Sequence, residues 1–178
     1  MPPLAPVTQA LLLINVAAFC IQYFIGGFTS FLALWPIGHG FMPWQVVTYA
    51  FLHGGLFHLF FNMMGLWMFG SEIERVWGNK RYLQFYMVCV LTAALAQLLT
   101  AALTGAVYPT VGASGGLFGL LLAFGMLFPN RQIMLLIPPI PMKAKVFVAV
   151  YGALELFLGV TGTQQGVAHF AHLGGMVG

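Results

Sequence analysis

Charged residues are almost absent from this chain, and their absence restricts the fold more than any other feature. No charged side chain occurs before Glu72, and 5% of the residues are charged whereas 61% are hydrophobic. A soluble domain has about 25% charged residues, so the composition excludes that class and indicates a membrane protein. We predict an all-α polytopic membrane protein, a single domain over residues 1–178, with six transmembrane helices near residues 7–26, 56–70, 82–103, 114–128, 146–160 and 167–178.

Segments 56–70, 114–128 and 167–178 are short for helices that cross about 30 Å of hydrocarbon. The segments 56–70 and 114–128 are plausible only if their ends stop inside the protein, because lipid cannot satisfy free backbone groups. We therefore expect helix ends, and with them water, within the bundle. The last segment is too short to reach the far side, so we expect the last helix to be cut short at Gly178.

The basic residues predict the orientation of the chain. All six fall on one side of the predicted bundle: Arg75, Lys80, Arg81, Arg131, Lys143 and Lys145. By the positive-inside rule the N-terminus is cytoplasmic, and the connections 27–55, 104–113 and 161–166 face outward. We expect an integral protein of a bacterial-type plasma (inner) membrane. Topology accounts for the net charge of +3, so we expect no nucleic-acid partner.

The connections differ in character. Residues 27–55 are too apolar and aromatic for a solvated loop, and we expect them to lie partly in the membrane interface. Three aromatic side chains are suited to anchor them there: Trp35, Trp44 and Tyr49. Prolines within residues 135–145 predict a stiff cytoplasmic connector. The run SEIER, residues 71–75, is expected to cap and end the second helix.

Polar groups gather in the outward half of the predicted bundle. All five histidines fall in or near it: His39, His53, His58, His169 and His172. Polar groups at membrane depth are costly and usually line a wet cavity. His58 and Asn62 are four residues apart, so their side chains share one helix face and both can donate hydrogen bonds. Taken alone, this pair is more typical of a polar clamp between helices.

Ser114 stands among glycines in the stretch VGASGG, at the start of the fourth predicted helix and on the same outward side. Two GxxxG patterns accompany it, Gly115 with Gly119 and Gly174 with Gly178. This spacing allows two helix backbones to approach closely. If these two glycine faces meet, the Ser114 hydroxyl and the His172 imidazole come within about 3 Å, the reach of a nucleophile and its base.

Such a pair predicts nucleophilic chemistry. A neutral imidazole accepts the serine proton near neutral pH, and backbone N–H groups at the start of the helix can hold a developing oxyanion. His58 and Asn62 can add side-chain donors. Glu155 is the one carboxylate in the later helices, and it is expected to face the bundle and to be hydrogen-bonded. Because the sequence supplies no obvious Asp for a triad, a dyad of Ser114 and His172 is the simpler prediction.

Three motifs occur in a defined order: HGGLFHLFFN at 53–62, GASGGLFG at 112–119 and AHLGGMVG at 171–178. With the predicted helices, they resemble the rhomboid intramembrane serine proteases over nearly the whole chain. The resemblance implies a six-helix rhomboid bundle. It also implies hydrolysis of peptide bonds in or beside transmembrane segments of single-span or polytopic membrane proteins in the lipid bilayer. Such substrates would enter laterally past the second and fifth helices, and neither a cofactor nor a metal is expected.

By this resemblance, Ser114 is the nucleophile and His172 the general base. His58, Asn62 and the Ser114 backbone amide would hold the oxyanion. Phe118, one turn after the serine, matches a position of an aromatic residue that packs on the catalytic imidazole.

Some positions leave alternatives open. Gln45 follows Pro-Trp where many relatives have Trp-Arg, so the role of that arginine is in doubt here. His169 is more typical of a solvated helix end than of a cavity, and His53 of a structural hydrogen-bonding residue. One alternative function is a non-catalytic relative that binds membrane helices, although such proteins typically lose the serine or the histidine. The other is a metal protein ligated by the four histidines of the outer motifs, namely His53, His58, His169 and His172, although no HExxH motif is present.

Overall fold

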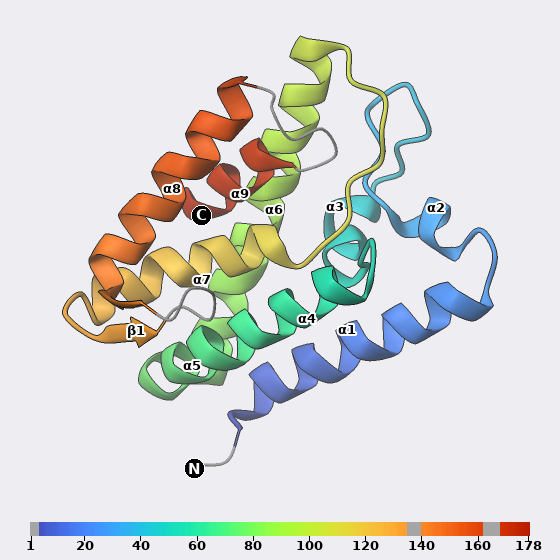
Figure 1. Ribbon diagram of the computed structural model, residues 1–178. Helices are drawn as coiled ribbons and strands as arrows, with labels where there is room; N and C mark the ends of the chain where they lie inside the picture. Colours follow the sequence, from blue (N-terminus) through green and yellow to red (C-terminus); the bar gives the residue numbers. More distant parts are fainter. Residues whose placement is uncertain (1–3, 135–139, 162–167) are drawn as a thin grey trace.

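A computed structural model describes residues 4–134, 140–161 and 168–178 (Figure 1). The helices in chain order are α1 (Pro6–Phe24), α2 (Phe28–Leu32), α3 (Gln45–Thr48), η1 (Tyr49–Phe51), α4 (Leu56–Gly65), η2 (Leu66–Gly70), α5 (Ser71–Trp77), α6 (Asn79–Thr104), α7 (Ser114–Leu127), α8 (Ala144–Thr161) and α9 (His169–Met176). Two short strands, β1 (Gln132–Met134) and β2 (Pro141–Lys143), lie between α7 and α8.

The long helices agree with the predicted helical membrane fold. Within the described residues, α1, α6 and α8 are each long and apolar enough to cross a membrane. Residues Leu56–Trp77 pass the same test together with Gln45–Phe51, from which they are bent by 96°. The apolar helix α7 is shorter, as expected for a helix that begins inside protein. The predicted number of six transmembrane helices stays a prediction.

The prediction that residues 71–75 cap and end the second helix is wrong. The helix continues from α4 through the π-helical turn η2 into α5 and ends at Trp77, before Gly78 with φ +75°. Inside it, Glu74 is 2% exposed and accepts three hydrogen bonds of 2.8 Å, from the Val7 and Thr8 amides and from Thr8 Oγ1. Its carboxylate therefore caps the first turn of α1, whose amides lack partners within their own helix.

The segment between α1 and α4 is folded against the bundle and holds three short helices (Figure 1). Trp44 is 40% exposed, but Tyr49 is 1% exposed and donates from its hydroxyl to the Val90 carbonyl at 2.8 Å. Tyr49 is therefore a core residue, and its predicted role as an interfacial anchor is wrong. Its burial follows from a hydrogen-bond partner for the hydroxyl inside the bundle.

The predicted stiff connector between α7 and α8 lies partly outside the described residues, at 135–139. Around that gap, β1 and β2 pair antiparallel, with Ile133 opposite Met142, which the sequence analysis did not predict. Arg131, beside β1, forms an ion pair of 3.1 Å with Glu72 of α5. This pair brings the start of α5 and the segment after α7 to the same end of the bundle, in agreement with the distribution of basic residues.

Helix α9 packs among α6, α7 and α8, where Figure 1 shows it in red between the orange and lime helices. Gly175 faces α7, where an added Cβ would overlap the Gly115 carbonyl oxygen, and Gly119 in turn faces the Gly175 carbonyl. Gly174 and Gly178 instead face α6, against its Ala96 and Cys89. The two predicted GxxxG faces therefore do not meet each other. Helix α9 contacts α7 through Gly175 and contacts α6 through Gly174 and Gly178.

Candidate active site

The loop before α7 positions Ser114. Leu34 and Thr110 exchange backbone hydrogen bonds of 3.0 and 2.9 Å, and the Gly112 amide donates to the Tyr49 carbonyl at 2.9 Å. Gly112 has φ +133°, a conformation that side-chain-bearing residues rarely adopt. The chain thus turns sharply into α7, with Ser114 as its first residue.

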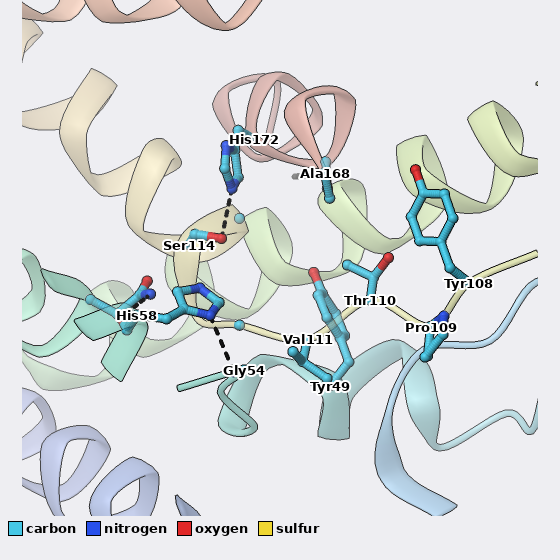
Figure 2. A pocket seen from close by; sticks show the side chains of 14 residues that line it. Tyr49, Gly54, His58, Tyr108, Pro109, Thr110, Val111, Ser114, Ala168 and His172 are labelled. Atoms are coloured by element: carbon cyan, nitrogen blue, oxygen red, sulfur yellow. Dashed lines mark hydrogen bonds between the residues drawn. The ribbon is translucent and has the colours of Figure 1, made fainter. Parts of the chain in front are cut away.

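Ser114 contacts His172 as the sequence predicted. Its Oγ lies 2.8 Å from His172 Nε2, and Figure 2 shows the serine reaching up from α7 to the imidazole of α9. The Phe118 ring stacks on this imidazole with centroids 4.5 Å apart and planes 5° apart, which confirms the expected packing. Stacking fixes the plane of the ring, so Nε2 stays directed at the hydroxyl.

His58 faces the serine from the opposite side. The Gly54 amide donates to His58 Nδ1 at 3.3 Å, so in a neutral ring the proton sits on Nε2. This Nε2 borders a small space next to Gly112. A Cβ added at Gly112 would lie 2.9 Å from His58 Nε2 and 3.4 Å from Ser114 Oγ. One small atom in that space would touch both a hydrogen-bond donor and the serine oxygen.

Asn62 lies next to His58 on the same face of α4, as predicted. Its Nδ2 donates to the His58 carbonyl at 2.9 Å, and one of its two N–H groups remains for another acceptor. Asn62 is 4% exposed and borders the same cavity as Ser114.

These groups line an open cavity of about 330 Å³. Figure 2 shows Ser114 between His172 and His58, with Tyr49, Thr110, Val111 and Tyr108 along one side. The cavity joins residues from α4, the loop before α7, the start of α7 and α9. The predicted gathering of polar side chains is therefore present around one cavity, and the cavity has room for a peptide backbone and water.

Glu155 and His169 complete the group in a way the sequence analysis did not predict. Glu155 Oε2 lies 2.9 Å from His172 Nδ1 and 2.7 Å from His169 Nδ1. His169 is 5% exposed, so its expected position at a solvated helix end is wrong. The reason is local: His169 and His172 are three residues apart on α9, so both rings face the carboxylate on α8.

The remaining histidines do not join this group. His39 is exposed on the loop before α3. His53 is 2% exposed and packs its ring edge-on against His58, with centroids 5.0 Å apart. Hydrogen bonds link Gln22 to the backbone of His53, while neither ring nitrogen of His53 has a partner among the described residues. The expected hydrogen-bonding role of His53 is met by its backbone, and the four histidines do not converge on one metal position.

Among the described residues, one group could hold a metal ion, formed by Glu155, His169 and His172. Their ligand atoms lie within 4.8 Å of one another. Its composition differs from the predicted four-histidine set, since a carboxylate replaces His53 and His58.

Gln45 stands in the sequence where many relatives have an arginine. In the structure it is 1% exposed and organises the loop before α3. Its Oε1 accepts from the Trp35 and Met42 amides at 3.2 and 3.1 Å, and its Nε2 faces the carbonyls of Phe31 and Gly40. An uncharged side chain thus ties this segment together without an ion pair.

The fold and the site together define a helical membrane protein with a serine–histidine pair in a polar cavity. The rhomboid domain profile matches residues 40–178, so the chain belongs to the rhomboid family. The family match supports the fold class and identifies the chain as an integral membrane protein.

Several curated relatives resemble this chain. Rhomboid protein 1, mitochondrial, of Saccharomyces cerevisiae is 35% identical over 99 residues, which cover 54% of this chain and 29% of the relative. Rhomboid protease GluP of Bacillus subtilis is 29% identical over 136 residues, which cover 76% of this chain and 24% of the relative. Rhomboid protease GlpG of Pectobacterium atrosepticum is 30% identical over 115 residues, which cover 60% of this chain and 41% of the relative. The chain thus spans less than half the length of each of these relatives.

Proposed function

We propose that this protein is an intramembrane serine endopeptidase that cleaves peptide bonds in or next to transmembrane segments of membrane proteins. The observation that carries the proposal is the 2.8 Å contact between Ser114 Oγ and His172 Nε2, beside a space bordered by the donor His58. A nucleophile, its base and an oxyanion donor within reach of one position are the parts that acyl transfer requires. Relatives named as rhomboid proteases support the same activity.

The proposed reaction follows from this geometry. Ser114 Oγ attacks the carbonyl carbon of the scissile peptide bond while His172 Nε2 accepts the hydroxyl proton. The resulting oxyanion occupies the space next to Gly112, where His58 Nε2–H donates to it, and Asn62 Nδ2–H and the Ser114 amide are the further donors that we propose. His172 then gives its proton to the leaving amine, the bond to nitrogen breaks, and an acyl-enzyme forms. A water, deprotonated by the same imidazole, hydrolyses this ester and restores the serine.

The substrate route rests on a second, apolar cavity. A groove of about 450 Å³ lies between α4 with η2 on one side and α7 with α8 on the other. Ser114 and Asn62 border it at one end, and Phe147 and Tyr151 of α8 line its wall. An unwound transmembrane segment could enter through this groove without leaving the apolar phase. Single-span and polytopic membrane proteins are therefore the substrates we propose.

The orientation of the protein follows from its charges. We place the N-terminus and the basic residues on the cytoplasmic side of a bacterial-type plasma (inner) membrane, as the positive-inside rule favours. Ser114 begins α7 and Arg131 follows the end of α7, so the site opens toward the outward side.

Cleavage of a model single-span substrate in proteoliposomes tests the proposal. Ser114→Ala should abolish cleavage, because no other group replaces the attacking oxygen. Ser71→Ala is a matched control, since Ser71 is a buried serine on α5 outside the cavity. Equal cleavage by wild type and Ser114→Ala would defeat the proposal. Substrate that crosslinks to the wild type but is never cut would instead favour a non-catalytic, helix-binding protein.

A further inference from the structure

The carboxylate of Glu155 has no task in a serine–histidine dyad, yet it contacts the proposed base directly. We propose that Glu155 is a positioning residue for His172, so that Ser114, His172 and Glu155 act as a triad supported by His169. This inference rests on the proposed function. It adds a third member to the predicted dyad of Ser114 and His172.

The position of Glu155 on α8 indicates that its carboxylate has a specific role. Its neighbours Leu154 and Leu156 are 46% and 51% exposed, as expected for side chains that face lipid, whereas Glu155 is 8% exposed and faces α9. A carboxylate at membrane depth is costly unless it is paired or solvated. An apolar residue would fill this position at lower cost. The carboxylate is compensated by two imidazole N–H groups, one of which belongs to the proposed base.

The hydrogen bond to Glu155 selects the useful tautomer of His172. An ionised carboxylate can only accept hydrogen bonds, so Oε2 accepts one from the N–H at His172 Nδ1, over 2.9 Å. Nε2 of the same ring is then bare and faces the Ser114 hydroxyl at 2.8 Å. This is the tautomer that a general base requires. When the ring takes the serine proton, the carboxylate also stabilises the positive charge that forms.

His169 orients the carboxylate rather than the serine. Its Nδ1 donates to the same Oε2 at 2.7 Å, so two N–H groups converge on one oxygen and fix its position. The two histidine rings are nearly perpendicular, with centroids 6.4 Å apart. His169 Nε2 is buried and has no partner in the part of the chain that the structure describes. His169 therefore acts through Glu155, and its loss should cost less than the loss of the carboxylate.

A metal ion held by these three side chains is the competing interpretation. The distances of 2.7 and 2.9 Å are those of hydrogen bonds between nitrogen and oxygen, and both Nδ1 atoms already have Oε2 as their partner. A metal would have to replace both bonds. The hydrogen-bonded arrangement needs no further component, so the triad is the interpretation that the geometry favours.

The test compares kcat and KM of wild type, Glu155→Gln, Glu155→Asp and His169→Gln on the model substrate. Glu155→Gln removes the charge at nearly constant volume and should lower kcat about 10²- to 10⁴-fold while KM stays the same. Glu155→Asp retains the charge on a shorter side chain and should recover part of that loss, while its kcat stays below the wild-type value. His169→Gln should lower kcat less than Glu155→Gln. Leu156→Ala, on the lipid side of α8, is the matched control and should keep wild-type kcat.

Thermal unfolding in detergent shows first which variants are folded. If Glu155→Gln does not fold, Glu155→Asp becomes the test, because its shorter side chain cannot reach both rings. Wild-type kcat in the folded Glu155 variant, with Ser114→Ala inactive, overturns the triad and leaves the proposed peptidase standing. Wild-type cleavage by Ser114→Ala defeats the peptidase proposal itself. Activity that chelators abolish, with stoichiometric metal lost from the Glu155 variant, also overturns the triad.

Discussion

The close approach of α9 and α7 at Gly175 should decide the reactivity of the serine. A methyl group added at Gly175 would overlap the Gly115 carbonyl oxygen and lie 2.7 Å from its carbonyl carbon, whereas such contacts are ordinarily 3.4 Å or longer. The obstacle is backbone, so the helices must separate by about 0.7 Å at least. That shift would lengthen the Ser114–His172 contact from 2.8 Å to about 3.5 Å, the limit of a hydrogen bond.

Gly175→Ala should therefore react with a fluorophosphonate about 10²-fold more slowly than wild type, since a misplacement of about 1 Å has that cost. Its thermal stability in detergent should fall by about 1–3 kcal/mol, as for other overpacked cores. Gly152→Ala on α8 is the control, because its added methyl would lie at an ordinary 3.7 Å from Met176 Sδ. A folded Gly175→Ala protein that reacts at the wild-type rate would refute the link between helix spacing and reactivity.

Three further predictions follow from individual contacts. His58→Ala should lower kcat about 10²- to 10³-fold by removing the proposed oxyanion donor. His39→Ala, at an exposed histidine, should not change kcat, and equal losses in the two variants would contradict the assignment. Glu74→Ala leaves two amides of α1 without their acceptor, and it should destabilise the protein by about 2–4 kcal/mol in thermal unfolding. Glu72→Ala breaks only the partly exposed ion pair with Arg131 and should cost about 1 kcal/mol or less, so a larger loss than in Glu74→Ala would be inconsistent with the capping role. Cleavage should persist in excess EDTA, and loss of cleavage would favour a metal site.

The sequence was sufficient for features that depend on local pattern. Apolar runs predicted the helices α1, α6 and α8 to within a few residues, because the bilayer imposes their length. Glycines around Ser114 predicted a close helix approach, and with it the contact to His172. The predicted contact between the two GxxxG faces was wrong, since spacing alone does not tell which of several neighbouring helices a glycine faces. In the structure α9 packs against α6, α7 and α8, and Gly175 rather than Gly174 contacts α7.

Contacts between residues far apart in the chain could not be predicted from the sequence. Glu74 accepts from Thr8 across 66 residues, and no local motif marks that pairing. Glu155 was expected to be hydrogen-bonded inside the bundle, but its partners depend on the packing of α8 against α9. The one available signal was the three-residue spacing of His169 and His172, which places two imidazoles on the same helix face as candidates for a single buried acid.

The most direct test of the account is to label detergent-solubilised wild-type protein with a fluorophosphonate and to locate the adduct by mass spectrometry. The account predicts one adduct, on Ser114, because this is the hydroxyl, among the residues that the structure describes, with an imidazole nitrogen at 2.8 Å. The adduct should be absent from Ser114→Ala and formed far more slowly in His172→Ala. A folded wild-type protein that remains unlabelled, or that carries the adduct on another residue, would contradict it.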